Sequence, residues 1–324
     1  MKNYKFPNGK YGRNISNLDD LLMEKGGRPM KNILVAGYRT GSTFTGEIIN
    51  SHPANFYLYE PMWDFGNERV RDPLIVDDAI KSIRAFFNCE FNKLQRFIDS
   101  VKSKLRFYKD NQGLGPYCAK ERELCSDPIF LTAVCRLYPF QSMKFTRLPL
   151  ESARVLLEDE HLRVRMILLE RDPRGVMQSR RQLDWCKNSS DCSDPKVLCK
   201  DMVTDHEVAV ELKKKYPHTF KVIRYEDLSL DLRHKAEEIF EFYGLNFHSN
   251  VEKFLETHTK KNSGNSYSSF RDSKKAPVHW RNEMNFTEVD EIQRVCSTAM
   301  KLWGYVLAVN ETHQKEFNPI IKDY

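Results

Sequence analysis

Apolar and polar positions divide the chain into alternating strand-like and helix-like stretches. Short apolar runs predict strands near residues 33–36, 56–59, 142–146, 164–170 and 220–225. Apolar residues recur at helical spacing near residues 43–51, 78–105, 150–159, 198–216, 231–243 and 288–303. Strands that alternate with helices are typical of a parallel sheet covered on both faces. The pattern therefore predicts an α/β fold of three layers, with helices flanking a central, mostly parallel sheet.

The same pattern predicts one main domain between two shorter segments. Residues 1–30 are polar and rich in Gly, Asn and Lys, so we expect a poorly ordered lead-in. The domain follows over residues 31–307, and residues 308–324 form a C-terminal tail. No apolar run approaches the ~20 residues that a membrane span needs, and no secretory apolar segment follows Met1.

The first predicted strand leads into a phosphate-binding loop. It reads Arg39-Thr40-Gly41-Ser42-Thr43-Phe44-Thr45 and opens the first predicted helix. Unpaired backbone N–H groups and the helix dipole hold an anion at such a helix start. The loop is P-loop-like, but Ser42 stands where a nucleotide triphosphatase has Lys, and the base of the loop is Arg39. We therefore predict a phosphate-bearing ligand other than a triphosphate; the alternative is an ordinary strand-to-helix turn with a Ser/Thr cap.

A second anion site is predicted after the fourth strand. Arg171 ends that strand, Pro173 suits the first turn of a helix, and Ser179 follows Arg171 by eight residues. An Arg and a Ser so placed can hold one phosphate from two sides. The alternative is a solvated basic turn, because Arg174, Arg180 and Arg181 lie beside them.

These segments, in this order, resemble those of sulfotransferases that use 3′-phosphoadenosine-5′-phosphosulfate (PAPS). The loop resembles their 5′-phosphosulfate loop, and Arg171 with Ser179 resembles the pair that holds the 3′-phosphate. The match is nearest the Golgi carbohydrate 6-O-sulfotransferases, which act on galactose, N-acetylglucosamine or N-acetylgalactosamine. It covers about residues 31–307 and includes the stretches 56–61, 186–199 with Asp194-Pro195, 224–228 (Arg-Tyr-Glu-Asp-Leu) and Trp280-Arg281.

The resemblance implies a set of site residues. Those that would bind PAPS, whose product is PAP, are Arg39, Thr40, Gly41, Ser42, Thr43, Phe44, Thr45, Arg171 and Ser179. Arg39 would also stabilise the bridging oxygen, and Glu60 would take the proton of a sugar hydroxyl during in-line attack. Because a sulfuryl group carries less charge than a phosphoryl group, no metal is required.

Glu60 is the predicted base because it ends the second strand, beside the loop in a parallel sheet. We expect a carboxylate there to lie outside the core; the alternative role is to close a turn before Pro61. His52 and then Asp64 are the next candidates, although His52 resembles part of a helix stop.

The sequence leaves the roles of several other residues open. Lys144 and Arg147 either meet the acceptor or the sulfate, or lie on a solvated strand edge. Tyr225 either stacks on adenine or packs on the sheet. Lys274, Trp280 and Arg281 occupy a region where the superfamily covers the 3′-phosphate.

Charge and cysteines fit this family without proving it. The net charge of +6 suits an anionic donor and a sulfated glycan, and no nucleic-acid-binding motif is present. The eight cysteines form no C-x-x-C pair and fit an oxidising lumen, with Cys186–Cys192 and Cys118–Cys125 spaced for local disulfides. Four N-x-[ST] sequons permit a glycoprotein. The resemblance implies the Golgi lumen; the N-terminal anchor usual in the family is not visible here, and we expect a truncated N-terminus.

The leading hypothesis is a PAPS-dependent carbohydrate sulfotransferase with a glycan or glycosaminoglycan acceptor. A tyrosylprotein sulfotransferase is the alternative within the superfamily. A P-loop kinase and a non-catalytic domain that binds sulfated glycans are the alternatives outside it.

Overall fold

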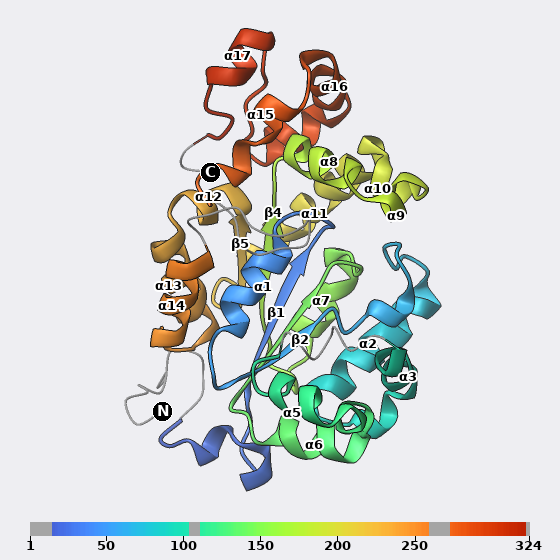
Figure 1. The fold of residues 1–324 in the computed structure, drawn as a ribbon, viewed down its shortest axis with the longest axis vertical. Helices are drawn as coiled ribbons and strands as arrows, with labels where there is room; N and C mark the ends of the chain where they lie inside the picture. Colours follow the sequence, from blue (N-terminus) through green and yellow to red (C-terminus); the bar gives the residue numbers. More distant parts are fainter. Residues whose placement is uncertain (1–14, 104–110, 259–272, 322–324) are drawn as a thin grey trace.

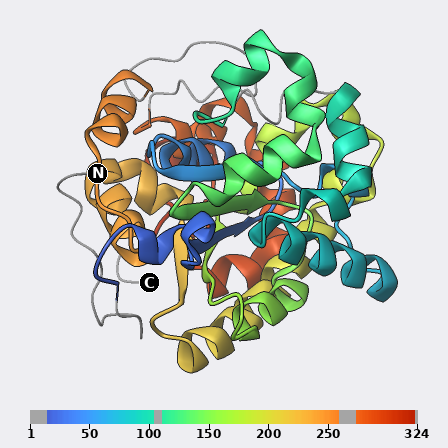
Figure 2. The same cartoon turned by 90° about the horizontal axis from the view of Figure 1, so that it is seen from below.

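A computed structural model describes residues 15–103, 111–258 and 273–321 of the chain. The chain forms one parallel sheet between two layers of helices (Figures 1 and 2). The strands are β1 (Met30–Ala36), β2 (Asn55–Tyr59), β3 (Phe140–Phe145), β4 (Arg165–Glu170) and β5 (Phe220–Arg224). Their order is β2-β3-β1-β4-β5, and every neighbouring pair is parallel. The predicted fold class and strand positions are confirmed.

The helices account for most of the remaining described chain. They are α1 (Ser42–Asn50), α2 (Pro73–Phe87), α3 (Gln95–Ser103), α5 (Gly115–Lys120), α6 (Pro128–Arg136), α7 (Leu150–Glu158), α8 (Pro173–Arg181), α9 (Asp184–Lys187), α10 (Ser190–Ser193), α11 (Pro195–Lys215), α12 (Tyr225–Leu230), α13 (Leu232–Tyr243), α14 (Ser249–His258), α15 (Trp280–Glu283), α16 (Phe286–Leu302) and α17 (Glu311–Glu316). No helix among the described residues is both long and apolar enough to cross a membrane.

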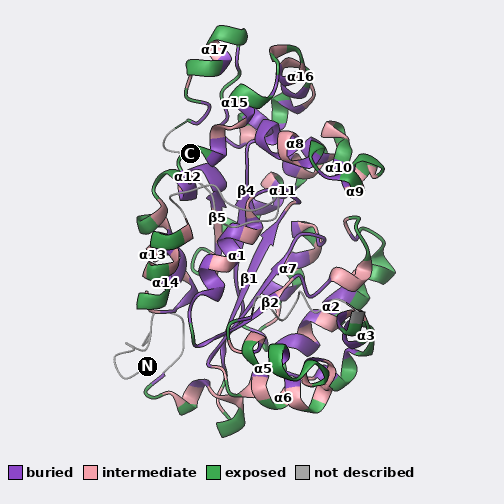
Figure 3. Ribbon diagram, in the orientation of Figure 1, coloured by how far each residue is buried: buried purple, intermediate pink, exposed green. Residues whose placement is uncertain are grey.

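Both faces of the sheet are buried (Figure 3). Ile33 and Val35 of β1 belong to a core cluster with α2, α7 and α11, whereas Leu34 and Ala36 belong to a second cluster with α1 and α13. Side chains alternate between the faces of a strand, so a strand covered on both faces reads as a continuous apolar run. This is why the strands were readable from the sequence.

Two predicted segments differ in the structure. The helical pattern over residues 78–105 is two helices, because α2 ends at Phe87 and Cys89 takes a left-handed conformation with φ of 54°. The lead-in predicted over residues 1–30 lies partly outside the described residues. From Ile15 onward it is not loose: Ile15 and Leu21 are buried in the second cluster.

Four disulfides include all eight cysteines. Cys118–Cys125 and Cys186–Cys192 confirm the two local pairs, and Cys89–Cys135 and Cys199–Cys296 are long-range. The last of these joins α11 to α16.

Candidate functional site

The predicted phosphate loop connects the carboxyl end of β1 to α1. Gly41 immediately precedes the helix with φ of 95°, and a Cβ there would lie 2.2 Å from the ring of Tyr225, so only glycine fits. No side chain caps the first turn of α1. Its backbone N–H groups are therefore placed to bind an anion.

The hydroxyl groups of the loop divide into two kinds. Those of Thr40 and Thr45 donate to the carbonyls of Gly37 and Gly41 at 2.9 and 3.2 Å, and thus hold the loop itself. The Thr43 hydroxyl lies 3.3 Å from that of Tyr59 at the end of β2. Ser42 and Phe44 are buried, and Phe44 packs in the second core cluster. These backbone and hydroxyl contacts give the loop a fixed shape.

Arg171, Ser179 and Arg39 come together beside this loop. Asp172 caps α8, which carries Ser179 in its second turn, and Arg171 precedes the cap. Arg39 Nε donates to Ser179 Oγ at 2.9 Å, and Arg171 donates to the Arg39 carbonyl at 3.0 Å. The two predicted anion sites therefore adjoin, and in this conformation the Arg39 side chain is directed at Ser179.

The ring of Tyr225 packs between Gly41 and Arg171. Its centroid lies 4.7 Å from the Arg171 guanidinium, and the residue is 5% exposed. The ring thus packs within the protein, and its stacking on adenine stays a prediction.

Glu60 lies in a buried cluster of charges at the ends of β2 and β3. Its Oε1 accepts from Lys144 Nζ at 2.6 Å and from Thr146 Oγ1 at 2.8 Å, and its Oε2 accepts from Arg147 at 2.6 Å. The residue is 4% exposed and has φ of 50°, a conformation that side chains other than glycine seldom adopt. The prediction that this carboxylate lies outside the core is wrong, as is a solvated edge for Lys144 and Arg147, which are 1–2% exposed.

The neighbouring cations determine the protonation of Glu60. Burial raises the pKa of its carboxyl, but the charges of Lys144 and Arg147 and the hydrogen bonds outweigh burial, so the pKa lies below its ordinary value. Glu60 is thus a carboxylate at neutral pH. A carboxylate has about four acceptor positions, so three donors leave room for one more.

The other base candidates lie elsewhere. His52 follows α1 and precedes β2, so it sits at the amino ends of the strands, away from the loop. It is buried beside Asn246, and burial lowers its pKa to about 4. This position contradicts the prediction that His52 is the next candidate for the base.

Two residues of the region predicted to cover the 3′-phosphate make contacts within the protein. Trp280 is buried under the Arg174 guanidinium, and Arg281 donates to the carbonyl of Phe317.

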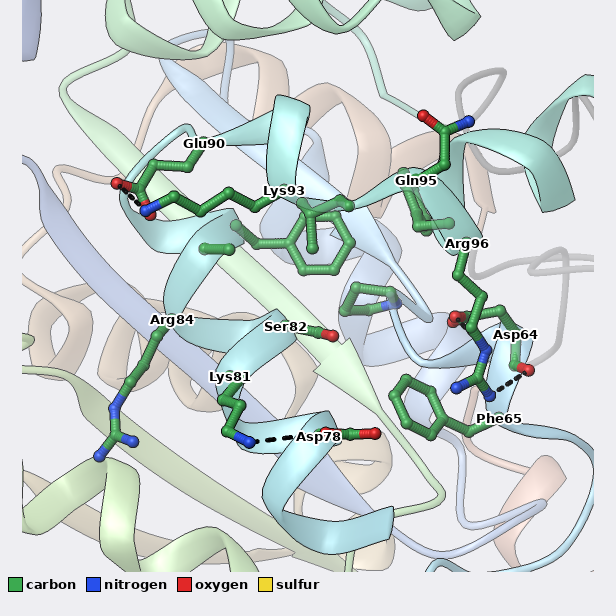
Figure 4. Close-up of a pocket in the computed structure, with 15 residues that line it drawn as sticks. Asp64, Phe65, Asp78, Lys81, Ser82, Arg84, Glu90, Lys93, Gln95 and Arg96 are labelled. Carbon is green, nitrogen blue, oxygen red and sulfur yellow. Dashed lines mark hydrogen bonds and ion pairs between the residues drawn. The ribbon is translucent and has the colours of Figure 1, made fainter. Parts of the chain in front are cut away.

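Asp64 lines a groove that starts at Pro61, one residue after Glu60 (Figure 4). The groove has a volume of about 500 Å³ and lies between α2, α3 and the short turn Trp63–Phe65. The Arg96 guanidinium stacks 4.1 Å from the Phe65 ring and pairs with Asp64 at 3.1 Å. Asp64 Oδ1 is buried and has no hydrogen-bond partner within the described ranges. Of the other charged residues that line the groove, Asp78 pairs with Lys81 and Glu90 with Lys93, whereas Arg84 pairs with Asp159 outside the lining.

Sequence reasoning missed a second buried carboxylate close to Arg171. Glu226 of α12 accepts from the Asp172 N–H and from the Tyr305 hydroxyl, both at 3.0 Å. Burial and the Asp172 carboxylate raise its pKa to about 7. The position of Glu226 within the stretch Arg-Tyr-Glu-Asp-Leu could have drawn attention to it. Its contact with Tyr305 could not be read from the sequence, because the two residues are 79 positions apart. In the part of the chain that the structure describes, no cluster of three or more His, Cys, Asp or Glu is arranged to hold a metal.

The chain resembles known proteins in sequence. Residues 29–304 match the family described as Sulfotransferase domain. The chain is 27% identical to human carbohydrate sulfotransferase 3 over 85% of this chain and 67% of that protein. It is 23% identical to rat carbohydrate sulfotransferase 1 over 89% and 82% of the two chains.

Solved structures were also compared. Retinol dehydratase in complex with retinol and PAP aligns with a TM-score of 0.45 and 16% identity, over 84% of this chain and 82% of that one. Sulfotransferase STF9 from Mycobacterium avium aligns with a TM-score of 0.42 and 15% identity, over 86% and 78%.

Proposed function

Because this chain belongs to the sulfotransferase domain family and is a sulfotransferase, we propose that it moves a sulfuryl group from PAPS to a hydroxyl group of a glycan. The observation that carries this proposal is the uncapped start of α1 beside Arg39, which donates to Ser179 and whose carbonyl accepts from Arg171. It provides two adjoining anion sites, and PAPS bears anionic groups at its 5′ and 3′ positions.

The residues present fit that donor. The backbone of Gly41 to Phe44, with the hydroxyls of Ser42 and Thr43, would hold the 5′ group at the start of α1. Arg171 and Ser179 would hold the 3′-phosphate. Thr40 and Thr45 keep the loop in shape through their bonds to Gly37 and Gly41.

The chemistry divides between the donor and two side chains. PAPS supplies an activated sulfuryl group on a phosphate leaving group. Glu60 takes the proton of the attacking hydroxyl at Oε2, where an acceptor position remains beside Arg147. Arg39, whose guanidinium donates to Ser179 in this structure, would turn from it to stabilise charge on the leaving oxygen. Lys144 and Arg147 keep Glu60 ionised and orient it.

For the acceptor we propose the 6-hydroxyl of galactose, N-acetylglucosamine or N-acetylgalactosamine within a glycan. The named carbohydrate sulfotransferases among the relatives support a glycan. The groove beside Pro61 would hold neighbouring sugars, because it begins one residue after Glu60 and is lined by an aromatic ring and by charged side chains. Four disulfides support an oxidising compartment, for which we propose the Golgi lumen.

A thermal-shift titration tests the donor assignment. PAP and ADP are added separately, each with and without Mg²⁺. Ligand at 100 times its Kd stabilises the folded protein by ~2.7 kcal/mol, so PAP should raise the melting temperature with or without Mg²⁺. A melting temperature that rises with ADP and Mg²⁺ but not with PAP would instead indicate a kinase. A melting temperature that does not change with PAP would refute the proposal. Keratan- and chondroitin-type chains assayed against acidic tyrosine peptides then identify the acceptor.

A further inference from the structure

A disulfide-closed loop contacts both sides of the candidate site. This loop, Leu183–Ser193, contains α9 and α10 and is closed by Cys186–Cys192. Leu183, Trp185 and the two cysteines pack together as a small cluster separate from the main core. The loop therefore has a packed shape of its own. We call it the disulfide loop.

The disulfide loop is attached to the phosphate loop. Arg180, 4% exposed, donates from Nε to the Tyr38 carbonyl at 3.2 Å and from its other end to the Cys192 carbonyl at 3.1 Å. The Trp185 ring meets the Tyr38 ring edge-on at 5.4 Å. Tyr38 is next to Arg39, so the disulfide loop fixes the backbone that carries the donor-binding residues.

Asp191 attaches the same loop to residues 66–71, which follow β2. Its Oδ2 accepts the Arg69 N–H at 2.6 Å, and its two oxygens accept from Arg71 at 2.7 and 2.8 Å. The Asp191 side chain is 12% exposed. Asp201 and Asp205 of α11 hold the Arg69 guanidinium from the other side, at 2.8 and 3.1 Å.

Residues 66–71 in turn hold Arg147. The Gly66 carbonyl accepts from Arg147 Nε, and the Val70 N–H donates to the Arg147 carbonyl at 2.8 Å. Both the side chain and the backbone of Arg147 are thus bound to a segment that Asp191 anchors. A terminal nitrogen of the same guanidinium donates to Glu60 Oε2 at 2.6 Å.

We propose that Asp191 is a positioning residue: through residues 66–71 it fixes Arg147 against Glu60, and through the disulfide loop it sets Glu60 relative to the phosphate loop. The link to catalysis rests on the proposed role of Glu60 as the base. The contacts from Asp191 to Glu60 are independent of that role. The contacts with Tyr38 beside the phosphate loop are made by Arg180 and Trp185, whereas the Asp191 carboxylate bonds Arg69 and Arg71. We therefore expect replacement of this carboxylate to change donor affinity little.

Asp191→Asn tests the proposal, with Asp184→Asn as the matched control in the same loop. Asn keeps the shape and one acceptor oxygen but loses the charge that binds Arg71. Asp184 is 96% exposed and pairs with Lys187 on the surface. We expect Asp191→Asn to lower kcat by about tenfold or more, as small displacements of catalytic groups do, with the KM for PAPS within about twofold of wild type. Asp184→Asn should match wild type in both.

The pH profile separates positioning from a merely structural role. Lys144, Arg147 and Tyr38 are the titratable groups that face Glu60. A less firmly held Arg147 lowers the pKa of Glu60 by less, so the acid limb of kcat should move to higher pH in Asp191→Asn and not in Asp184→Asn.

A direct titration keeps the inference distinct from the proposed mechanism. Carbon NMR of glutamate-labelled enzyme, assigned with Glu60→Gln, follows the Glu60 carboxyl. A raised pKa in Asp191→Asn supports the positioning role even if kcat is unchanged, in which case it is the role of Glu60 as base that fails. An unchanged pKa overturns the inference, with or without a lower melting temperature. If Asp191→Asn does not fold, Arg71→Gln loosens the same contact from the exposed partner, and the same two outcomes apply.

Discussion

At the scale of the residue, Glu60 keeps a negative charge in a place where burial alone would neutralise it. Its two cationic neighbours and the Thr146 hydroxyl compensate for lost hydration. Because the folded-state pKa is lowered, this carboxyl contributes stability above its ordinary pKa of 4.5, and that stability is lost as pH falls through the lower folded value. This carboxyl therefore remains ionised in mildly acidic solution.

Replacing Glu60 with Gln should therefore have two separate effects. The rate of sulfuryl transfer in a single turnover should fall by ~10²–10⁴-fold, the usual contribution of a general base. Lys144 and Arg147 would lose their buried counter-charge, which should destabilise the fold by roughly 3–5 kcal/mol. PAP affinity should hardly change, because the proposed donor contacts lie on other residues.

Rate, melting temperature and PAP affinity are measured on the same preparation. Glu151→Gln, an exposed carboxylate of α7, serves as the control. A rate loss below tenfold in folded enzyme would remove Glu60 from the mechanism and leave it a purely structural ion pair.

The second prediction at this scale concerns Arg171. Arg171→Ala should weaken PAP binding by roughly 1.5–3 kcal/mol, the range for a hydrogen bond to a charged group. Arg181→Ala is the matched control, because Arg181 lies on the same α8 but is 43% exposed and pairs with Glu288. Calorimetric titration with PAP measures both. Equal affinities for the two variants would contradict the assignment of the 3′-phosphate to Arg171.

At the scale of the element, α12 connects the start of α8 to the C-terminal part of the chain through Glu226. The carboxyl of Glu226 bonds the backbone of Asp172 and the hydroxyl of Tyr305. Burial raises the pKa of Glu226, because neither Asp172 nor Tyr305 brings a positive charge to its carboxyl. The pKa of Glu60 is lowered instead, because Lys144 and Arg147 do. The two buried acids therefore respond to pH in opposite directions.

Glu226 should make the fold less stable as pH rises. Its pKa is about 7 when folded and 4.5 ordinarily, so the folded state holds the proton more tightly between these values. The stabilisation is complete below about 4.5 and is lost as pH rises through about 7, by about 1.4 kcal/mol per unit of pKa difference. Glu226→Gln should therefore gain stability relative to wild type from pH 5 to pH 8.

Denaturant unfolding at several pH values measures this difference. Glu291→Gln, an exposed position on α16, controls for the loss of one charge. Curves for Glu226→Gln and wild type that run parallel across this range would show that Glu226 does not titrate there.

At the scale of the whole molecule, parallel strands bring the separate parts of the site to one edge of the sheet. The loop after β1, Glu60 after β2, and Arg171 after β4 all follow carboxyl ends of strands in one parallel sheet, in which β3 separates β2 from β1. The groove beside Pro61 extends this edge toward α2 and α3. A long acceptor would thus contact more of the molecule than a short one.

Phe65→Ala tests that extension. Loss of the ring should raise the KM for a long glycan by about five- to tenfold, or about 1 kcal/mol, and leave the KM for a disaccharide and for PAPS unchanged. Tyr117→Ala, an exposed aromatic on α5 outside the groove lining, is the control. An equal change for long and short acceptors would place the outer sugars elsewhere.

The sequence by itself determined the strands, their parallel arrangement and the glycine turn between β1 and α1. Runs such as Ile33–Val35 are apolar on both faces, and the glycine at position 41 is needed by the local backbone, so both features are written in neighbouring residues. The local disulfides Cys118–Cys125 and Cys186–Cys192 were readable for the same reason.

Only the tertiary structure decided the surroundings of the charged groups. The burial of Glu60 depends on Lys144 and Arg147, more than 80 residues away in the chain, and the contact of Arg39 with Ser179 spans 140 residues. The pKa of a carboxyl is determined by desolvation and by charges within a few ångströms, and neither is encoded in neighbouring sequence positions. Identical residue types thus became a paired carboxylate at Glu60 and an acid with a raised pKa at Glu226, because the fold surrounded them differently.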